Sequence, residues 1–291
     1  MTHFARRVIS GGVATVTIAG ALVIAACTSR MPAPATAPAT APPPAAAPAA
    51  APENPFEPRV GQPGKDVVWV PTPQATVDAM LNLAKLTKDD FLVDLGSGDG
   101  ITVITAAKRG ARAMGIEFNP DMVALAEQRA KEAGMTQRAT FKQGDFFQTD
   151  FSTANVLTMF LLPSLNERLR PLILDMKPGT RVVTNTFRMG SGDDEWMPET
   201  EQRVDGCESS WCTAILYVVP AKVAGTWKMD TRTLTFTQKF QMVSGTLGTT
   251  PITDGKLNGY DITFTVDGQK YSGRVSAEGK TITGANWSAS R

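Results

Sequence analysis

The stretch Phe91-Leu92-Val93-Asp94-Leu95-Gly96-Ser97-Gly98-Asp99-Gly100 decides the fold class. Its first five residues are apolar except for Asp94, and a short apolar run of this kind is typical of a strand buried in a parallel sheet. Three glycines follow at once, and apolar residues at helical spacing flank the stretch on both sides. The stretch therefore predicts the first strand, turn and helix of an α/β domain.

Strands and helices alternate along the rest of this region. The pair Asn119-Pro120 supplies the cap and the first turn of one helix. Such alternation predicts a mostly parallel sheet with helices on both faces, in a Rossmann-like domain over 56–220. The expected strands are 91–95, 111–118, 139–147, 156–162 and 181–187, and expected helices include 120–133 and 165–176.

Acidic residues lie at the ends of three expected strands. Asp94 precedes the glycines, Glu117 ends the second strand, and Asp145 lies in the third. Ligands of open parallel sheets bind beyond the carboxyl ends of the strands. Glycines let the backbone approach a ligand, and an acid after the second strand suits a ribose diol. The pattern predicts a nucleotide-type site at this edge; the alternative is an ordinary turn with scattered acids.

Two cofactor classes compete for this geometry. A dinucleotide site requires G-x-G-x-x-G and binds pyrophosphate at a helix N-terminus. Here the spacing is G-x-G-x-G, and Asp94 is poorly placed to face pyrophosphate. A carboxylate suits a cationic ligand with an amino group, and Asp145 could accept from an adenine amine. These features favour S-adenosylmethionine.

Several stretches resemble known methyltransferase motifs. Asp94–Gly100, Gly115-Ile116-Glu117 and Gly144-Asp145-Phe146 are similar to the motifs of class I S-adenosylmethionine-dependent methyltransferases. More narrowly, the chain resembles the ATP synthase c-subunit lysine N-methyltransferase family over about 67–190. The stretches that carry this second likeness are Val70-Pro71-Thr72-Pro73, Asp145–Phe151, Phe160-Leu161-Leu162-Pro163 and Arg181-Val182-Val183.

This resemblance implies a seven-stranded sheet, S-adenosylmethionine as donor and a protein lysine as acceptor. It implies that Glu117 holds the ribose and that Asp145 and Phe146 hold the adenine. The methionine end of the donor would be lined by the first turn, with Asp94, Gly96, Ser97, Gly98 and Gly100.

A lysine acceptor must lose a proton before it attacks a methyl group. From a pKa near 10.4, deprotonation at pH 7 costs about 4.6 kcal/mol, and an apolar slot lowers that pKa. Phe160, Leu162 and Pro163 lie at the end of the fourth expected strand and are candidates for the walls of this slot. The alternative for these three residues is ordinary core packing.

Charge and histidine content exclude other chemistries. The net charge is +1, which argues against a nucleic-acid partner. The single histidine, His3, lies in the N-terminal segment, so a processed chain would contain none. Catalytic triads and histidine-ligated zinc would then be excluded. We expect no metal cofactor.

The N-terminal residues have the pattern of an export signal. Residues 1–26 contain Arg6 and Arg7 and then an apolar run, typical of a secretory signal peptide. The ending Ile24-Ala25-Ala26-Cys27 resembles the bacterial lipobox, which implies lipidation at Cys27. An uncleaved transmembrane anchor is the alternative. The sequence predicts a membrane-anchored lipoprotein facing the periplasm, with an Ala/Pro-rich linker over 27–55.

The C-terminal residues 221–291 change to a strand-forming composition. Alternating threonines and apolar residues, with a hairpin turn at Asp267-Gly268, predict a small antiparallel β domain. It could form a half-barrel or a sheet packed on the first domain, with a structural or docking role. Outside the cytoplasm, Cys207 and Cys212 are expected to form a disulfide.

Three functions fit the sequence. The leading hypothesis is a protein-lysine methyltransferase that takes a protein substrate with an accessible lysine. A second is a methyltransferase for a small molecule or a lipid. The third is a non-catalytic envelope lipoprotein that binds or acts as a scaffold, motivated by the scarcity of donor outside the cytoplasm.

Overall fold

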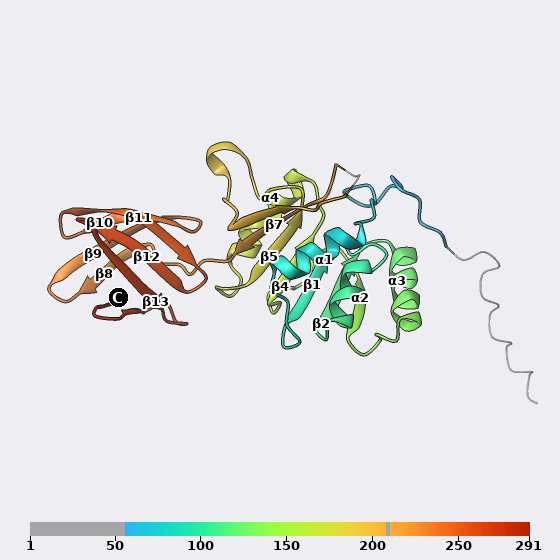
Figure 1. Ribbon diagram of the computed structural model, residues 1–291, viewed down its shortest axis with the longest axis horizontal. Helices are drawn as coiled ribbons and strands as arrows, with labels where there is room; N and C mark the ends of the chain where they lie inside the picture. The colour runs from blue at the N-terminus through green and yellow to red at the C-terminus, as the bar shows by residue number, and fades with distance from the viewer. Residues whose placement is uncertain (1–55, 208–209) are drawn as a thin grey trace, which may run out of the picture. The chain divides into compact units, whose positions relative to one another are not determined.

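The computed structural model describes residues 56–207 and 210–291 (Figure 1). The expected signal peptide, the linker and Cys27 lie outside these residues. Within the described part of the chain, no helix is long and apolar enough to cross a membrane.

A seven-stranded sheet forms the centre of the α/β domain, with the strand order β3-β2-β1-β4-β5-β7-β6. Strands β1 to β5 pair in parallel, and β7 runs antiparallel to both β5 and β6. The expected methyltransferase-type sheet is confirmed. The strands are β1 (Phe91–Leu95), β2 (Arg112–Glu117), β3 (Ala139–Gln143), β4 (Val156–Met159), β5 (Arg181–Asn185), β6 (Thr200–Arg203) and β7 (Thr213–Val218).

Helices cover both faces of this sheet, because successive side chains of a strand point to opposite faces. In β1, Leu92 packs in a cluster with residues of α1 and α2, whereas Val93 packs in a cluster with residues of α4. Asn119 caps α3 by accepting a hydrogen bond from the amide of Asp121 at 2.9 Å. The helices are α1 (Gln74–Leu83), α2 (Ile101–Lys108), α3 (Pro120–Glu132) and α4 (Pro163–Leu174), with a short 3-10 helix η1 (Gly192–Asp194).

Strands β3 and β4 end earlier than the sequence predicts. The Asp145 carboxylate accepts a hydrogen bond from the amide of Phe147 at 2.8 Å, and its carbonyl accepts one from Gln148 at 2.9 Å. These local bonds form a turn and replace the sheet ladder. Phe160 likewise follows the end of β4. Asp145 and Phe160 therefore lie in loops at the edge where ligands bind.

The C-terminal strands form a closed antiparallel barrel, with the order β10-β11-β12-β13-β14-β15-β8-β9 (Figure 1). The expected small β domain is confirmed, and its sheet is closed. Trp227, Phe236 and Phe264 are buried within it, so side chains fill the interior. Its strands are β8 (Gly225–Met229), β9 (Arg232–Lys239), β10 (Met242–Leu247), β11 (Thr250–Asn258), β12 (Asp261–Val266), β13 (Gln269–Val275), β14 (Thr281–Gly284) and β15 (Ser288–Ser290).

Candidate active site

A pocket opens at the carboxyl edge of the parallel strands. The structure brings together there all but one of the residues predicted to bind the cofactor, although they lie on three different strands and turns. They are Asp94, Gly96, Ser97, Gly98, Glu117, Asp145 and Phe146. Gly100 is not among the described residues that line the pocket.

The glycines of the first turn serve two different purposes. Gly96, Gly98 and Gly100 all have positive φ, between 52° and 82°, a region that favours glycine. A Cβ on Gly98 would lie 2.6 Å from Nε1 of Trp69, so its absence leaves room for this indole beside the pocket. A Cβ on Gly100 would instead meet the Phe141 ring at 2.7 Å. Gly100 is therefore required for packing beneath the site.

Asp94 is a buried carboxylate at the end of β1. Its side chain accepts a hydrogen bond of 2.6 Å from Oγ1 of Thr158, and the residue is only 6% exposed. Burial raises the pKa of Asp94 to about 7; the Thr158 bond opposes the rise, and the nearby charges of Glu117 and Asp99 add to it. A buried carboxylate with this pKa is suited to a cationic ligand, which would stabilise its charged form.

Glu117, at the end of β2, is held in a defined orientation. One carboxylate oxygen accepts from the amide of Gly98 and the other from the amide of Asn119, each at 2.9 Å. These bonds tie the glycine turn to β2. Each oxygen keeps a further lone pair, so the carboxylate can still accept from the two hydroxyls of a ribose.

Asp145 pairs with a lysine that the sequence analysis does not identify. Nζ of Lys65 lies 2.5 Å from the Asp145 carboxylate and 5.4 Å from the centre of the Phe118 ring. The hydrogen bond from Lys65 is the main cause of the lowered pKa of Asp145. The residues 61–72, called here the N-terminal loop, also contribute Trp69 to the pocket. Only the motif Val70-Pro71-Thr72-Pro73 points to this loop in the sequence.

Aromatic side chains line the pocket beyond β4 and β5. Phe160, Phe187 and Trp211 are these aromatic residues, and the exposed Leu162 also lines the pocket. Of the four, Phe160 and Leu162 are positions that the sequence analysis predicts. Pro163 is outside the lining among the described residues; it is the first residue of α4, where its fixed φ suits a helix start. Sequence reasoning misses Phe187 and Trp211, because neither belongs to a motif.

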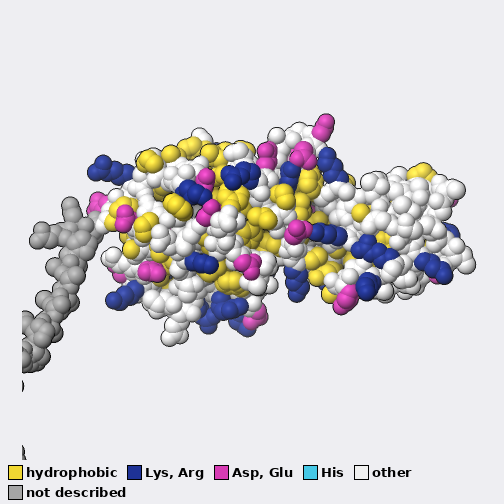
Figure 2. All heavy atoms as spheres, turned by 180° about the vertical axis from the view of Figure 1, so that it is seen from behind, with side chains coloured by type: hydrophobic (Ala, Val, Ile, Leu, Met, Phe, Trp, Pro, Cys, Tyr) yellow, Lys and Arg dark blue, Asp and Glu magenta, His cyan; other side chains and the backbone are white. Residues whose placement is uncertain are grey.

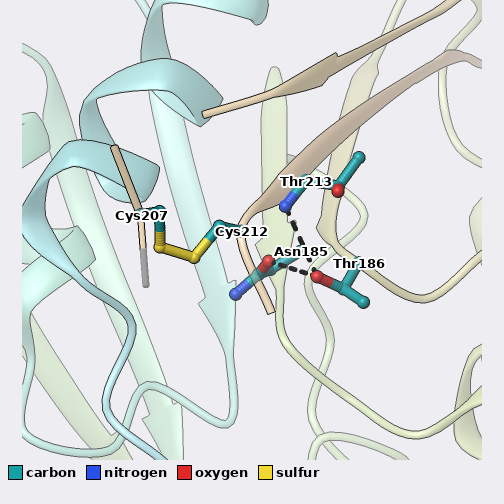
Figure 3. Close-up of a disulfide and its surroundings, with 5 residues drawn as sticks. All are labelled: Asn185, Thr186, Cys207, Cys212 and Thr213. Atoms are coloured by element: carbon teal, nitrogen blue, oxygen red, sulfur yellow. Dashed lines mark hydrogen bonds between the residues drawn. A yellow bond between two sulfur atoms is a disulfide. The ribbon is translucent and has the colours of Figure 1, made fainter. Parts of the chain in front are cut away.

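Cys207 and Cys212, which directly follows Trp211, are joined by a disulfide (Figure 3). Cys212 is fully buried and immediately precedes β7, so the disulfide closes a short loop that contains Trp211. Among residues 56–207 and 210–291, no three histidine, cysteine or acidic side chains gather closely enough to hold a metal ion.

The polar side chains that line the pocket fit S-adenosylmethionine. Five acidic residues line this cavity, and three of them, Asp94, Glu117 and Asp145, suit a ligand with a sulfonium, an ammonium, a ribose and an adenine amine. The other two are Asp66 and Asp99. Oγ of Ser97 is buried there without a hydrogen-bond partner among the described residues, so it can bind a ligand group.

Comparison with known proteins identifies the family. A family model described as the ANTKMT methyltransferase domain matches residues 94–200. A protein-lysine N-methyltransferase of Saccharolobus islandicus is 41% identical over 156 residues, which are 53% of this chain and 94% of that relative. The chain is an S-adenosylmethionine-dependent methyltransferase of the ANTKMT family.

Other methyltransferases match over similar lengths. The ATP synthase c-subunit lysine N-methyltransferase of Homo sapiens is 30% identical, covering 53% of this chain and 71% of that relative. A crystal structure of an RNA methyltransferase from Salinibacter ruber in complex with S-adenosyl-L-homocysteine is 44% identical, with a TM-score of 0.49. It covers 53% of this chain and 96% of that chain.

The methyltransferase residues have separable tasks. The donor supplies an electrophilic methyl group, and the carboxylates at the three strand ends would hold its cationic and hydroxyl groups. The aromatic side chains of the same pocket would exclude water around the acceptor and bring it in line with the methyl group. Positioning of this kind accounts for much of the catalysis of such displacements, potentially about 7–11 kcal/mol.

Proposed function

We propose that this methyltransferase transfers a methyl group to the side-chain amine of a protein lysine. The observation that carries the proposal is that one pocket is lined both by the carboxylates of Asp94, Glu117 and Asp145 and by a cluster of aromatic rings, those of Phe160, Phe187 and Trp211. The names of the relatives support it, because the Saccharolobus protein and the human protein are both lysine N-methyltransferases.

The aromatic cluster suits a lysine in two ways. Phe160, Phe187 and Trp211 present ring faces, which exclude water from around an entering side-chain amine. The same rings can pack along the four methylenes of a lysine side chain. Water can take the proton that the amine releases, so a chain without a histidine base can carry out the reaction.

The test is incubation of the full-length protein with isotopically labelled donor and a cell-envelope extract. We expect label in protein, and we expect mass spectrometry to place it on Nε of lysine. Asp94→Asn is the matched control and should give no label. Label confined to lipid, to small molecules or to added RNA would contradict a lysine acceptor. Donor binding without transfer to any fraction would support the scaffold hypothesis instead.

We also propose that the chain is an exported lipoprotein, anchored at Cys27 and facing the periplasm. The signal-like residues 1–26 support this placement, as does the Cys207–Cys212 disulfide, since disulfides persist in oxidising compartments. Membrane fractionation should find the protein in the envelope and incorporation of labelled fatty acid should depend on Cys27. Recovery of the wild-type protein from the cytoplasm would contradict the placement.

The surface around the α/β domain is consistent with a protein partner. Basic and acidic side chains are interspersed with apolar ones on the face seen in Figure 2, without a continuous basic patch on that face. A nucleic-acid acceptor would favour a basic surface.

A further inference from the structure

We propose that Trp211 determines acceptor specificity in this methyltransferase: with Phe160 and Phe187 it forms an aromatic wall that binds the cationic amine of lysine and of its methylated products, and the Cys207–Cys212 disulfide holds its ring in place. This inference rests on the proposed lysine acceptor. It adds a residue that lies beyond the matched residues 94–200.

The three rings come from separate parts of the chain and lie side by side in the lining of the pocket. Phe160 follows β4, Phe187 follows β5, and Trp211 precedes β7. The centre of the Phe160 ring lies 6.0 Å from that of Phe187 and 6.2 Å from that of Trp211. Rings at these distances are in contact, so the three form one continuous wall. All three line the cavity that holds the donor-binding carboxylates.

The exposure of Trp211 separates it from the structural tryptophans. Trp196 and Trp227 are each 1% exposed, whereas Trp211 is 40% exposed. Trp211 also lines the pocket, and an exposed aromatic side chain in a pocket lining is typical of a binding surface. Tryptophan is also the best aromatic partner for a cation, and aromatic walls bind methylated ammonium groups by this interaction. We infer that its ring contacts the acceptor amine.

Two sets of bonds fix the backbone around Trp211. On one side, the disulfide ties Cys212 back to Cys207, and the amide of Val204 donates to the Cys212 carbonyl at 2.8 Å. On the other side, Thr213 begins β7, which pairs with β5. Because Trp211 directly precedes Cys212, both anchors restrict its backbone.

Thr186, which directly precedes Phe187, bonds to Thr213, which directly follows Cys212 (Figure 3). Its amide donates to the Thr213 carbonyl at 2.7 Å, and its hydroxyl oxygen accepts from the Thr213 amide at 3.4 Å. Its φ of 64° is a strained conformation for a β-branched residue, and such strain concentrates at functional sites. The strained turn directs the chain into Phe187, so the positions of Phe187 and Trp211 depend on one cluster of bonds.

The test measures binding, so it needs neither turnover nor the natural acceptor. Nα-acetyl-Nε,Nε,Nε-trimethyllysine methylamide is titrated by calorimetry onto the full-length oxidised protein saturated with S-adenosylhomocysteine. The neutral analogue, with a tert-butyl group in place of the trimethylammonium, is titrated in parallel. We expect the cation to bind at least about fivefold more tightly than the neutral analogue, since the wall acts on charge.

Variants then separate the ring from the disulfide. Trp211→Ala should weaken binding of the cation at least tenfold, Trp211→Phe should recover most of it, and Cys207→Ser with Cys212→Ser should weaken it severalfold. Affinity for S-adenosylhomocysteine should stay within twofold in all three, which shows that they fold. Equal binding of the two probes, absence of binding to the wild type, or unchanged affinity in Trp211→Ala would each overturn the inference. Failure of lysine labelling in the envelope extract, with probe binding intact, would count against the proposed function alone.

Discussion

Replacing Asp94 with asparagine should weaken donor binding by at least about 100-fold and should stabilise the ligand-free protein above neutral pH. The affinity should fall because the substitution removes the buried negative charge that pairs with the cationic ligand. The positive charge of the ligand is then buried without a partner, which costs several kcal/mol. Calorimetry with S-adenosylmethionine at pH 8 measures it. Donor binding by Asp94→Asn within threefold of wild type would show that Asp94 does not face the cation.

The gain in stability follows from the raised pKa of Asp94, about 7 against an ordinary 3.8. Between these values the folded protein keeps a proton on Asp94 that the unfolded chain releases. The free energy of unfolding therefore falls as pH rises through this window, and above pH 7 the penalty is complete. A shift of about three pKa units corresponds to at most about 4 kcal/mol. Chemical denaturation of both proteins at pH 4 and pH 8 should show the difference only at pH 8.

Asp90 offers a matched control on the same strand–helix unit. It is also buried, and burial alone would raise its pKa, but hydrogen bonds from Arg181 and Thr87 outweigh burial and hold the pKa below its usual value. The pH dependence of stability from Asp90 is therefore opposite to that from Asp94. The ionised form of Asp90 stabilises the fold, and this stability is lost as pH falls through the lowered pKa. Asp90→Asn should therefore destabilise the protein at pH 8. Two buried aspartates that change stability in the same direction would refute this electrostatic account.

The same protonation should make donor binding depend on pH. Below about pH 7 Asp94 carries a proton in the ligand-free protein, so binding of a cation must expel it. Donor affinity should fall up to tenfold per pH unit between pH 7 and pH 5 and should be nearly flat above pH 8. The hydrogen bond from Thr158 opposes the rise in the pKa of Asp94. Thr158→Val, which removes the hydroxyl, should therefore raise this pKa further and move the loss of donor affinity to higher pH.

The sequence predicts the donor end of the site better than the acceptor end for a physical reason. Asp94 and Glu117 lie at the ends of β1 and β2, and Asp145 follows β3. Parallel strands bring these ends to one edge of the sheet, whatever path the loops take. Trp211 and Lys65 reach the pocket through a disulfide loop and the N-terminal loop, whose paths depend on contacts distant in sequence. No local periodicity encodes such contacts, and the same holds for closure of the barrel, which depends on pairing of β15 with β8.

Gly100 packs against Phe141 and does not line the pocket. Gly100→Ala should lower the free energy of unfolding by about 2–5 kcal/mol. Its φ is 82°, so an alanine there costs about 1–2 kcal/mol in backbone conformation. The added Cβ would also lie 2.7 Å from the Phe141 ring and 2.9 Å from Cβ of Ala126, and overpacking of this kind costs about 1–3 kcal/mol. Chemical denaturation in the absence of donor measures the sum.

Gly134 is the control that isolates the packing contribution. Its φ is 69°, close to that of Gly100, but a Cβ there would have nothing within 4 Å. Gly134→Ala should cost only the conformational part, about 1–2 kcal/mol. The two variants should therefore differ by the overpacking alone, and equal losses would mean that α2 and α3 can move apart to accept the methyl group. Since Gly100 is the N-cap residue of α2 and belongs to the glycine-rich turn, any such movement would appear as weaker donor binding in Gly100→Ala and not in Gly134→Ala.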